Sequence, residues 1–455
     1  MQIIIVGCGN VGRTLTEALS KEGHNITVIE EDSDVVKKVV NRLDVMGIVG
    51  NGVSFSILKD AGIETADLMI AVTDSDERNL LSCLIARKAG KCNTIARVRG
   101  HEYAKEIGFI KDELGLSMVI NPEYALASEA ARLLKFPSAN KIETFAKGKA
   151  ELVRMTVSED SKLCNRSLKD INKEMNLPVL IGMVKRGEDV FIPDGSFILH
   201  DKDEISVIGT PRKMIAFFRM MGKPTAGVHS ATIVGGGQTC FYLAQMLLSY
   251  GINVKIFEND PARCDELAAA LPEAVVIEAD GTDRNELLEE NLAGTESFVV
   301  LTGVDEENIM LSLYAATVTR AKRIIRVHRP GYNELIGTLD VGSVLNPRNI
   351  TAEKILQYVR GMTNSLGSQQ IESLYRMYGE RVEAIEFVIP AGSPVTGIPL
   401  AELKIKKGVL IACINHEGDI IMPTGSSRIQ AGDSVIILTT HMGFDEIEDI
   451  LDRAQ

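Results

Sequence analysis

The stretch Ile3-Ile4-Ile5-Val6-Gly7-Cys8-Gly9-Asn10-Val11-Gly12 opens the chain with an apolar run that ends in Gly-x-Gly-x-x-Gly. The β-branched run predicts a buried strand, and the glycines predict a tight turn into a helix. In a parallel sheet, such a turn presents backbone N–H groups to a pyrophosphate. Because the acid Glu30 ends the next apolar run, 30 minus 7 or 23 residues after Gly7, the segment predicts a dinucleotide site.

A second version of this phrase stands far downstream, in Ala231-Thr232-Ile233-Val234-Gly235-Gly236-Gly237-Gln238-Thr239-Cys240. The offset is constant, since 235 minus 7 and 237 minus 9 both equal 228, and it also carries Glu30 onto Glu258. One added residue then pairs Asn51 with Asp280, Thr73 with Thr302 and Arg97 with Arg326. Agreement at this many spaced positions indicates an internal duplication, whose halves are called the first and second copies below.

Each copy alternates short apolar runs with helical patterns, which is typical of a doubly wound parallel sheet. A shorter element with hairpin-like turns follows each copy and is itself repeated, because Pro193, Gly195 and Asp203 recur 230 residues later. The predicted class is α/β, with two doubly wound parallel-sheet Rossmann domains, each followed by a small α+β lobe. The predicted domains are a Rossmann domain at 1–138, a lobe at 139–222, a second Rossmann domain at 228–364 and a second lobe at 371–455. Linkers are expected at 222–227 and 361–370.

The first copy supplies a candidate residue for each part of a nucleotide. Gly7 permits the tight turn, Gly9 lets the backbone approach the pyrophosphate, and Gly12 lets helix and strand pack closely. Glu30 can accept hydrogen bonds from ribose hydroxyls, and its charge would repel a 2′-phosphate. NAD or NADH is therefore favoured over the phosphorylated form, although the adenosine ribose of ATP or ADP would satisfy the same carboxylate. Glu31 and Asp32 leave the position of the acid open by one residue.

The ends of two predicted strands supply further candidate ligand-binding residues, because in this fold the ligand lies in a crevice at the carboxyl ends of the strands. Thr73 and Asp74 end the fourth predicted strand, and Arg97 ends the fifth. An arginine among apolar neighbours needs an anion, which is either a ligand phosphate or, as the alternative, Asp74 or Asp76 in a structural ion pair. The complete set of predicted cofactor-binding residues in the first copy is Gly7, Cys8, Gly9, Asn10, Val11, Gly12, Glu30, Asn51, Thr73, Asp74 and Arg97. In the second copy it is Gly235, Gly236, Gly237, Gln238, Thr239, Glu258, Asp280, Thr302 and Arg326.

The second copy departs from the first at two of these positions. Cys240 stands where Gly12 does, and Gly303 stands where Asp74 does. The second change removes a possible charged hydrogen bond, worth about 1.5–3 kcal/mol. We therefore expect the second site to bind a nucleotide with a different affinity or preference.

Composition narrows the possible partners and compartment. The 455 residues carry a net charge of −13, which argues against nucleic acid as a general partner. The seven cysteines show no Cys-x-x-Cys spacing, which fits reduced thiols rather than disulfides or a metal site. No apolar stretch approaches the roughly 20 residues that span a bilayer, and no signal peptide is recognised, so a cytoplasmic protein is expected.

The first-copy phrase, together with Ala71-Val72-Thr73-Asp74-Ser75-Asp76-Glu77 and Ile95-Ala96-Arg97-Val98-Arg99, resembles the tandem RCK-domain family. This resemblance covers essentially the full length. It implies a regulatory protein that binds NAD(H), and ATP or ADP, as signals. The residues to which the resemblance assigns this binding are Gly7 to Val11, Glu30, Thr73, Asp74 and Arg97 in the first copy and Gly235 to Thr239, Glu258, Thr302 and Arg326 in the second. It also implies a homo-oligomer, dimer or tetramer, that associates at the inner face of the membrane with a membrane-embedded potassium channel or transporter subunit of the Trk type.

The residues themselves offer little chemistry for an enzyme. The seven histidines are scattered, and no nucleophile elbow, Walker sequence or metal-ligand cluster is recognised. We therefore expect a non-enzymatic sensor that acts through a conformational change. The alternatives are an NAD-dependent oxidoreductase with duplicated Rossmann domains and a free-standing nucleotide sensor that acts on soluble partners.

Overall fold

The computed structural model describes residues 1–100, 103, 106–135, 139–222, 227–329, 336, 339–365, 370–378 and 381–452. Residues 223–226 and 366–369 of the two predicted linkers, and the predicted domain ends 138 and 455, lie outside these ranges. The chain forms two compact units, each assembled from both halves of the sequence. Unit 1 contains Met1–Ala131 and His229–Leu356, and unit 2 contains Arg132–Val228 and Gln357–Gln455.

A six-stranded parallel sheet forms the centre of the first copy. Its strand order is β3-β2-β1-β4-β5-β6, so the order reverses between β1 and β4, where a crevice opens at the carboxyl ends. The strands are β1 (Gln2–Val6), β2 (Asn25–Glu30), β3 (Met46–Val49), β4 (Leu68–Ala71), β5 (Asn93–Arg97) and β6 (Met118–Ile120). Strand β1 is buried from Ile3 to Val6, which is why it reads as a continuous apolar run.

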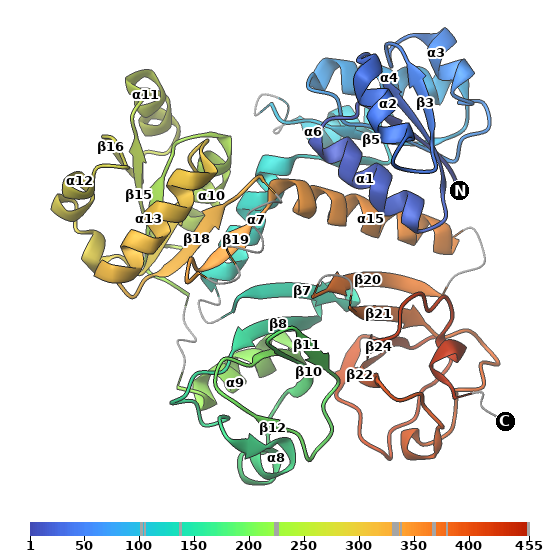
Figure 1. Ribbon diagram of the computed structural model, residues 1–455, viewed down its shortest axis with the longest axis vertical. Coiled ribbons are helices and arrows are strands. Elements are labelled where there is room, and N and C mark those ends of the chain that lie inside the picture. Colours follow the sequence, from blue (N-terminus) through green and yellow to red (C-terminus); the bar gives the residue numbers. More distant parts are fainter. Residues whose placement is uncertain are drawn as a thin grey trace. The chain divides into compact units, whose positions relative to one another are not determined.

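Helices cover this sheet, as the blue region of Figure 1 shows. They are α1 (Asn10–Lys21), α2 (Ser33–Val40), α3 (Phe55–Asp60), α4 (Asp76–Ala89) and α6 (Ile107–Glu113), and the next helix, α7 (Pro122–Lys135), instead leads away from this sheet, with Tyr124 against Tyr242 of the second copy. Asp32 caps α2 and Ser75 caps α4, since each side chain accepts from backbone N–H groups of the first turn. Helix α1 instead begins at Gly9 without a side-chain cap.

The second copy repeats this plan in the order β16-β15-β14-β17-β18-β19. Its register is also preserved, because Val6 pairs with Ala71 and the equivalent Val234 pairs with Val300. The strands are β14 (Ser230–Val234), β15 (Asn253–Glu258), β16 (Val275–Glu278), β17 (Ser297–Val300), β18 (Lys322–Arg326) and β19 (Ser343–Leu345). The helices are α10 (Gln238–Ser249), α11 (Pro261–Ala270), α12 (Arg284–Glu289), η2 (Leu292–Gly294), α13 (Asp305–Val318) and α15 (Pro347–Ser365). The prediction of two doubly wound parallel sheets is confirmed.

Helix α15 is longer than the sequence pattern predicted. The second linker was expected to begin at Gly361, yet the helix continues to Ser365. Apolar residues at helical spacing continue past Val359 to Met362. A single glycine costs a helix only about 1 kcal/mol, so Gly361 does not end it.

Each small lobe contains a five-stranded antiparallel sheet. The first has the order β11-β10-β13-β8-β7, and the second has the equivalent order β23-β22-β24-β21-β20. The elements of the first lobe are β7 (Lys141–Phe145), η1 (Ala146–Gly148), β8 (Ala150–Thr156), β9 (Arg166–Ser167), α8 (Leu168–Met175), β10 (Leu180–Arg186), β11 (Asp189–Phe191), β12 (Ile198–Leu199), β13 (Glu204–Gly209) and α9 (Pro211–Met220). Those of the second are β20 (Ile371–Met377), β21 (Val382–Val388), η4 (Leu400–Glu402), β22 (Val409–His416), β23 (Asp419–Ile421), β24 (Ser434–Thr439) and η5 (Ile447–Ile450). Short 3-10 turns thus stand in the second lobe where α8 and α9 stand in the first.

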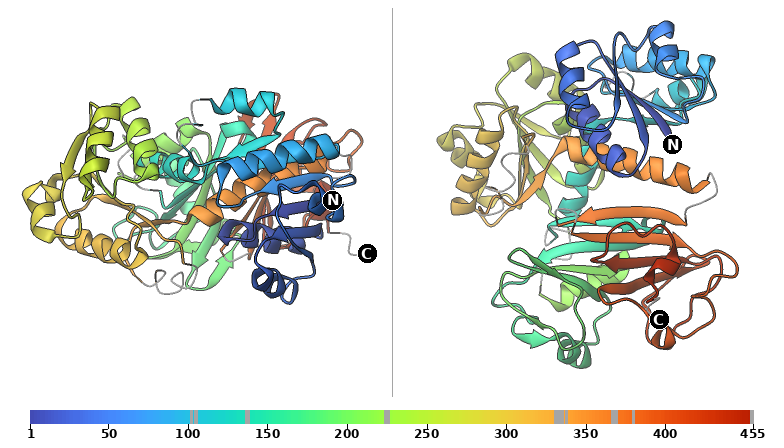
Figure 2. Two further views of the ribbon diagram at one scale, coloured as in Figure 1. Left: turned by 90° about the horizontal axis from the view of Figure 1, so that it is seen from above. Right: turned by 45° about the vertical axis from the view of Figure 1, so that its right-hand side comes forward.

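The two lobes share one core within unit 2. Phe145, Leu152 and Met183 of the first lobe pack in the same apolar cluster as Val382 and Ile436 of the second. Their sheets lie side by side in Figures 1 and 2. A buried carboxylate, Glu386, also joins them, because it accepts from the backbone N–H of Ala146 at 3.1 Å and from Ser434 Oγ at 2.5 Å.

Candidate functional site

A cavity of about 590 Å³ opens at the carboxyl ends of the strands in the first copy. It lies at the point where the strand order reverses, which is where this fold holds ligands. Among the predicted residues, the cavity is lined by Gly7, Gly9, Asn10, Val11, Glu30, Asn51, Thr73, Asp74 and Arg97. Cys8 and Gly12 belong to the same turn but are not part of the lining.

Two glycines of the first turn are required by close packing. Gly7 has φ of +93°, and a Cβ there would lie 2.9 Å from the backbone of Thr73. A Cβ at Gly12 would lie 2.0 Å from the carbonyl oxygen of Gly7. Gly9 has open space around its Cβ position, so its surface toward the cavity is bare backbone. The turn therefore leaves the uncapped N–H groups at the start of α1 free for an acceptor.

The acid at the end of β2 is tied to the glycine turn. Glu30 Oε2 accepts from the backbone N–H of Cys8 at 2.7 Å, while Oε1 accepts from Glu31 at 2.8 Å. Glu31 forms an ion pair with Arg78 at 3.2 Å, and Asp32 caps α2. Of the three consecutive acids, Glu30 is thus the one that is held against the turn.

A polar network joins the ends of β4 and β5. Thr73 Oγ1 donates to Asn79 Oδ1 at 2.7 Å, and Asn79 Nδ2 donates to the carbonyl of Arg97 at 2.9 Å. The Arg97 guanidinium donates to the carbonyl of Thr73 and forms no ion pair with Asp74 or Asp76, all of which are described residues. Burial lowers the pKa of Arg97, and its buried Nε has no hydrogen-bond partner. The arginine is therefore anchored to the backbone, and the alternative of a structural ion pair is not what the structure shows.

The sequence patterns missed several charged residues of the cavity. The first copy adds Arg78, Arg99 and Glu123, and the second copy adds His328 and Arg348. Arg99 donates to the carbonyl of Asp74 at 2.5 Å. Burial raises the pKa of Glu123, and its Oε2 has no hydrogen-bond partner. Arg99 lay within the motif that carries the family resemblance, but no local signal brings His328 and Arg348 to the first copy.

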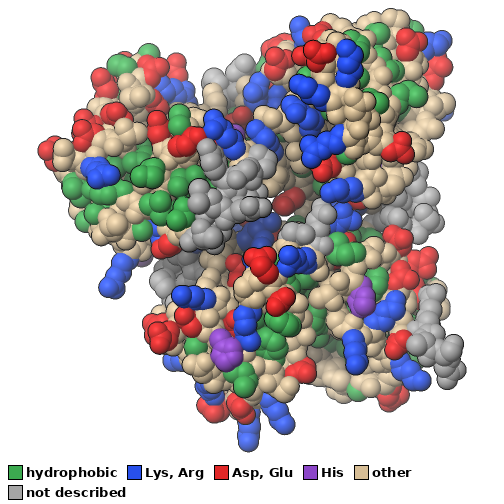
Figure 3. Space-filling view, in the orientation of Figure 1, with side chains coloured by type: hydrophobic (Ala, Val, Ile, Leu, Met, Phe, Trp, Pro, Cys, Tyr) green, Lys and Arg blue, Asp and Glu red, His purple; other side chains and the backbone are tan. Residues whose placement is uncertain are grey.

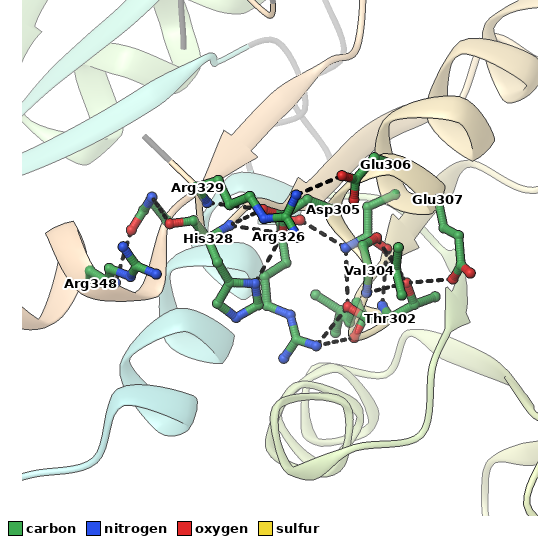
Figure 4. A network of polar contacts seen from close by, with 12 residues as sticks. Thr302, Val304, Asp305, Glu306, Glu307, Arg326, His328, Arg329 and Arg348 are labelled. Atoms are coloured by element: carbon green, nitrogen blue, oxygen red, sulfur yellow. Dashed lines mark hydrogen bonds and ion pairs between the residues drawn. The ribbon is translucent and has the colours of Figure 1, made fainter. Parts of the chain in front are cut away.

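The second copy preserves the frame of the first. Gly235 has φ of +95°, and Glu258 Oε2 accepts from the backbone N–H of Gly236 at 2.6 Å. Thr302 Oγ1 donates to Asn308 Oδ1 at 2.7 Å, and the Arg326 guanidinium donates to the carbonyl of Thr302 at 2.7 Å. Figure 4 shows Thr302 and Arg326 with Asp305, whose carboxylate accepts from the backbone and ring nitrogens of His328.

Four predicted residues of the second copy remain. Asp280 follows the third strand, β16, and Gly237, Gln238 and Thr239 stand at the start of α10. Asp280 accepts from the backbone N–H of Thr282 at 2.9 Å, as Asn51 does from Val53 at 3.0 Å, so both form a turn after the third strand. Thr239 is buried in α10 beside Gly237, at which the helix begins without a side-chain cap. Gln238 faces a different, largely apolar cavity of about 1020 Å³ that Phe241 and Tyr242 also line.

The cysteines of the two turns are buried. Burial raises the pKa of the Cys8 thiol to about 11 and that of Cys240 to about 12. Both thiols are therefore protonated at neutral pH, which is the condition of an unreactive cysteine. All seven cysteines are free.

Two family models match the chain twice each. The TrkA-N domain model matches residues 3–122 and 231–347, and the TrkA-C domain model matches residues 152–222 and 384–452. The chain is 31% identical to "Trk system potassium uptake protein TrkA homolog 2" of Methanosarcina mazei, over 99% of this chain and 100% of that protein. It is 30% identical to "Trk system potassium uptake protein TrkA" of Haemophilus influenzae, over 99% of this chain and 98% of that protein.

Solved structures share the fold at lower identity. The "GsuK channel bound to NAD" matches with a TM-score of 0.61 and 17% identity, over 96% of this chain and 76% of that chain. The "Crystal Structure of the GsuK RCK domain" gives the same score and identity, over 96% of this chain and 92% of that chain. Within the described part of this chain, no helix has the length and apolar character needed to cross a bilayer.

Proposed function

We propose a function from the premise that this chain belongs to the TrkA family of potassium-uptake proteins, whose two domain types it carries twice. In this proposal the chain is a regulatory subunit that binds NAD or NADH, and ATP or ADP, in its Rossmann copies. Nucleotide occupancy shifts the conformation of the chain and so controls a membrane potassium channel or transporter of the Trk type.

The observation that carries the proposal is the first-copy cavity, where a glycine turn, an acid and several arginines converge. The uncapped N–H groups of α1 and the guanidinium of Arg97 suit a pyrophosphate. Glu30 lines the same cavity with its carboxylate held in place by the Cys8 N–H, which suits the hydroxyls of an adenosine ribose. The cavity is within the usual size range for small-molecule sites.

NAD is the first ligand to test, because GsuK, which has this fold, is described as bound to NAD. Glu30 disfavours a ligand with a 2′-phosphate by charge repulsion, so NADP should bind more weakly than NAD. ATP and ADP present the same ribose to Glu30 and differ from NAD in their phosphates. All of these ligands can therefore compete for one cavity.

A regulator responds to its ligand only if two conformations bind that ligand with different affinity. Coupling of this kind is typically worth about 1–3 kcal/mol. In the proposal the protein acts as a homo-oligomer in the cytoplasm, at the inner face of the membrane through its partner. If the protein did not co-purify with any potassium-transport subunit, that result would favour the alternative function of a free-standing nucleotide sensor that acts on soluble partners.

The binding test compares Glu30→Gln with wild type in a calorimetric titration with NADH. Gln keeps an oxygen for the Cys8 N–H but removes the charge and one acceptor for the ribose. We expect about tenfold weaker binding at one site, with the fold retained and a thermal stability lowered by about 1 kcal/mol, because the amide nitrogen cannot accept from the Glu31 N–H. Glu64→Ala, at an exposed ion pair with Lys59, is the matched control and should bind as wild type does. An unchanged titration for Glu30→Gln would remove Glu30 from the site.

The rival function, an NAD-dependent oxidoreductase, makes the opposite prediction for turnover. An oxidoreductase needs an acid or base beside the nicotinamide ring, and the first cavity offers Asp74 and Arg97 near the crevice. Incubation with NADH and a panel of carbonyl substrates should leave the NADH absorbance constant. Steady oxidation of NADH would contradict the regulatory function.

A further inference from the structure

We propose that unit 1 has a further ligand site, separate from the nucleotide cavity, for an aromatic molecule that carries a single acidic group. The site is the cavity of about 1020 Å³ that Gln238 faces, and its walls come from both Rossmann copies. The ring of the ligand fills the apolar space, and its acidic group binds the guanidinium of Arg263. The inference goes beyond the proposed function, because it requires no nucleotide.

Both walls of this cavity are largely apolar, and each belongs to one copy. The first copy contributes Ile107 of α6, strand β6 and the start of α7, and the second copy contributes α10 and α11. The walls touch where Tyr124 and Tyr242 lie edge to face, with ring centroids 5.6 Å apart, and where Asn121 donates to the Tyr242 hydroxyl at 3.3 Å. The space of about 1020 Å³ between them is near the upper end of the size range of small-molecule sites.

The aromatic side chains of the cavity favour a ring as the body of the ligand. Phe241 and Tyr242 pack against each other with ring centroids 5.7 Å apart, and both line the cavity together with Tyr124. Tyr124 is 51% exposed, so a ligand can cover ring surface that now faces water. Contacts between aromatic rings contribute about 0.5–1.5 kcal/mol beyond the burial of their area.

The charged residues of the lining favour an acidic group on the ligand. They are Arg263, Glu266 and Lys354, which together carry one net positive charge. Arg263 Nη1 pairs with Glu266 at 2.7 Å, and its Nε donates to the carbonyl of Gly236 at 2.8 Å, so the guanidinium is held in one orientation. Among the described residues Arg263 Nη2 has no hydrogen-bond acceptor. This nitrogen can therefore donate to a carboxylate or sulfonate.

The equivalent groove of the first copy shows that the shared fold does not require an apolar cavity here. A cavity of about 320 Å³ lies against α1 and the end of α2, and its lining includes Arg13 and Arg42. These positions are equivalent to Phe241 and Ala270, because 241 minus 13 and 270 minus 42 both equal 228. The second copy thus has a ring and a small apolar side chain where the first copy has two arginines.

A ligand in this cavity contacts both copies at once. Its binding therefore favours the arrangement of unit 1 in which the two walls are close. The cavity is thus a second place at which a small molecule can act on the conformation of the chain.

The test uses two fluorescent probes that share their rings and differ in charge. 8-Anilinonaphthalene-1-sulfonate (ANS) is an aromatic monoanion, and N-phenyl-1-naphthylamine is its neutral counterpart. We expect the full-length wild type to bind ANS at a single saturable site with a rise in emission, and to bind the neutral probe more weakly. Arg263→Gln should weaken ANS binding about tenfold and leave binding of the neutral probe unchanged. Arg263→Lys, which keeps the charge, should restore part of the ANS affinity.

A second pair of variants locates the bound probe. Ala270→Trp places a large ring in the cavity and should weaken binding of both probes about tenfold or more. Ala268→Trp is the matched control, because Ala268 is an exposed alanine of the same helix that does not line the cavity. It should bind both probes as wild type does. Equal thermal unfolding of the two variants would show that lost binding in Ala270→Trp is not a loss of fold.

Three results would overturn the inference. The first is that the folded wild type does not bind ANS. The second is that Ala270→Trp binds ANS as wild type does while NADH displaces the probe, which would place ANS in the nucleotide cavity. The third is an equal loss of both probes in Arg263→Gln, which would show that the site does not select an acid. None of these results affects the proposed function, which depends on the NADH titration of Glu30→Gln.

Discussion

The first and second copies have nearly the same frame but different charges around it. In both, the first glycine has a positive φ, at +93° and +95°, and the acid accepts from the turn, at 2.7 Å and 2.6 Å. In both, a threonine, an asparagine and an arginine connect the fourth and fifth strands. The glycine, acid, threonine, asparagine and arginine that form the framework of the predicted site are thus present in both copies.

The differences lie where a ligand's phosphates would meet side chains. Asp74, Arg78, Arg99 and Glu123 of the first copy correspond to Gly303, Glu307, His328 and Arg348 of the second. On the face drawn in Figure 3, Lys and Arg side chains gather over the N-terminal Rossmann fold, at upper right, while Asp and Glu are frequent over the other. Equal frames with unequal charges support the proposal that the two copies bind different ligands, or the same ligand at different concentrations.

The largest expected effect is that of Gly12→Ala, which tests whether the two turns are interchangeable. The added Cβ would lie 2.0 Å from the Gly7 carbonyl oxygen, and backbone cannot move aside cheaply. We expect a loss of about 3 kcal/mol or more in stability and loss of the first site, measured by thermal unfolding and titration. Cys240→Ala, at the equivalent position, only shortens a buried side chain and should cost about 1 kcal/mol. Equal stability of the two variants would show that the turns do not differ.

The next effect concerns the acid that the second copy lacks. Asp74→Gly should weaken NADH binding at the first site about tenfold, and Gly303→Asp should strengthen it at the second by a similar factor. A side chain fits at Gly303, because nothing lies within 4 Å of its Cβ position. Titration of both variants checks the pair. Weaker binding by Gly303→Asp would show that the acid repels the ligand instead of bonding to it.

A smaller effect is expected from the acid of the second copy. If the second site is the weaker one, Glu258→Gln should reduce total NADH binding less than Glu30→Gln does. The backbone N–H groups of Asn259 and Asp260 donate to Glu258 Oε1, so Gln, which keeps one of the two acceptor oxygens, disturbs the turn less than Ala would. An equal or larger loss for Glu258→Gln would show that the ranking of the sites is wrong.

The smallest effect compares the two lobes. Arg186 pairs with Asp203 in the first, and the equivalent His416 pairs with Asp433 at 2.6 Å in the second. The hydrogen bond to Asp433 raises the pKa of His416, so this pair stabilises the fold fully below the unfolded pKa of about 6.5. That contribution is lost as the pH rises through the higher folded pKa. His416→Arg should therefore flatten the fall of melting temperature from about pH 6 to about pH 8, and an unchanged slope would contradict it.

Much of the frame was predictable because it is local. The glycine turn, the apolar run before it and Glu30 lie within one strand-helix-strand unit, and their spacing alone indicates a parallel sheet. The constant offset then extended each inference to the second copy. The fold class follows from these residues, and the domain boundaries and site residues stay predictions.

The rest depends on contacts between distant segments. His328 and Arg348 reach the first cavity only because unit 1 assembles both Rossmann copies, which no periodicity reveals. The hydrogen bond from the Cys8 N–H to Glu30 could not be predicted from the sequence, because Glu31 and Asp32 are equally plausible partners for the turn. The second lobe has 3-10 turns where the first has α8 and α9. This difference could not be predicted, because the residues on which the lobe repeat was recognised lie in the turns between strands and are the same in both lobes.

The most direct test of two unequal sites is calorimetric titration of the wild-type chain with NADH. We predict two binding events per chain with different affinities, the tighter one weakened by Glu30→Gln and the weaker one by Glu258→Gln. A single event that responds to only one of the two substitutions, or two events of equal affinity, would contradict the account.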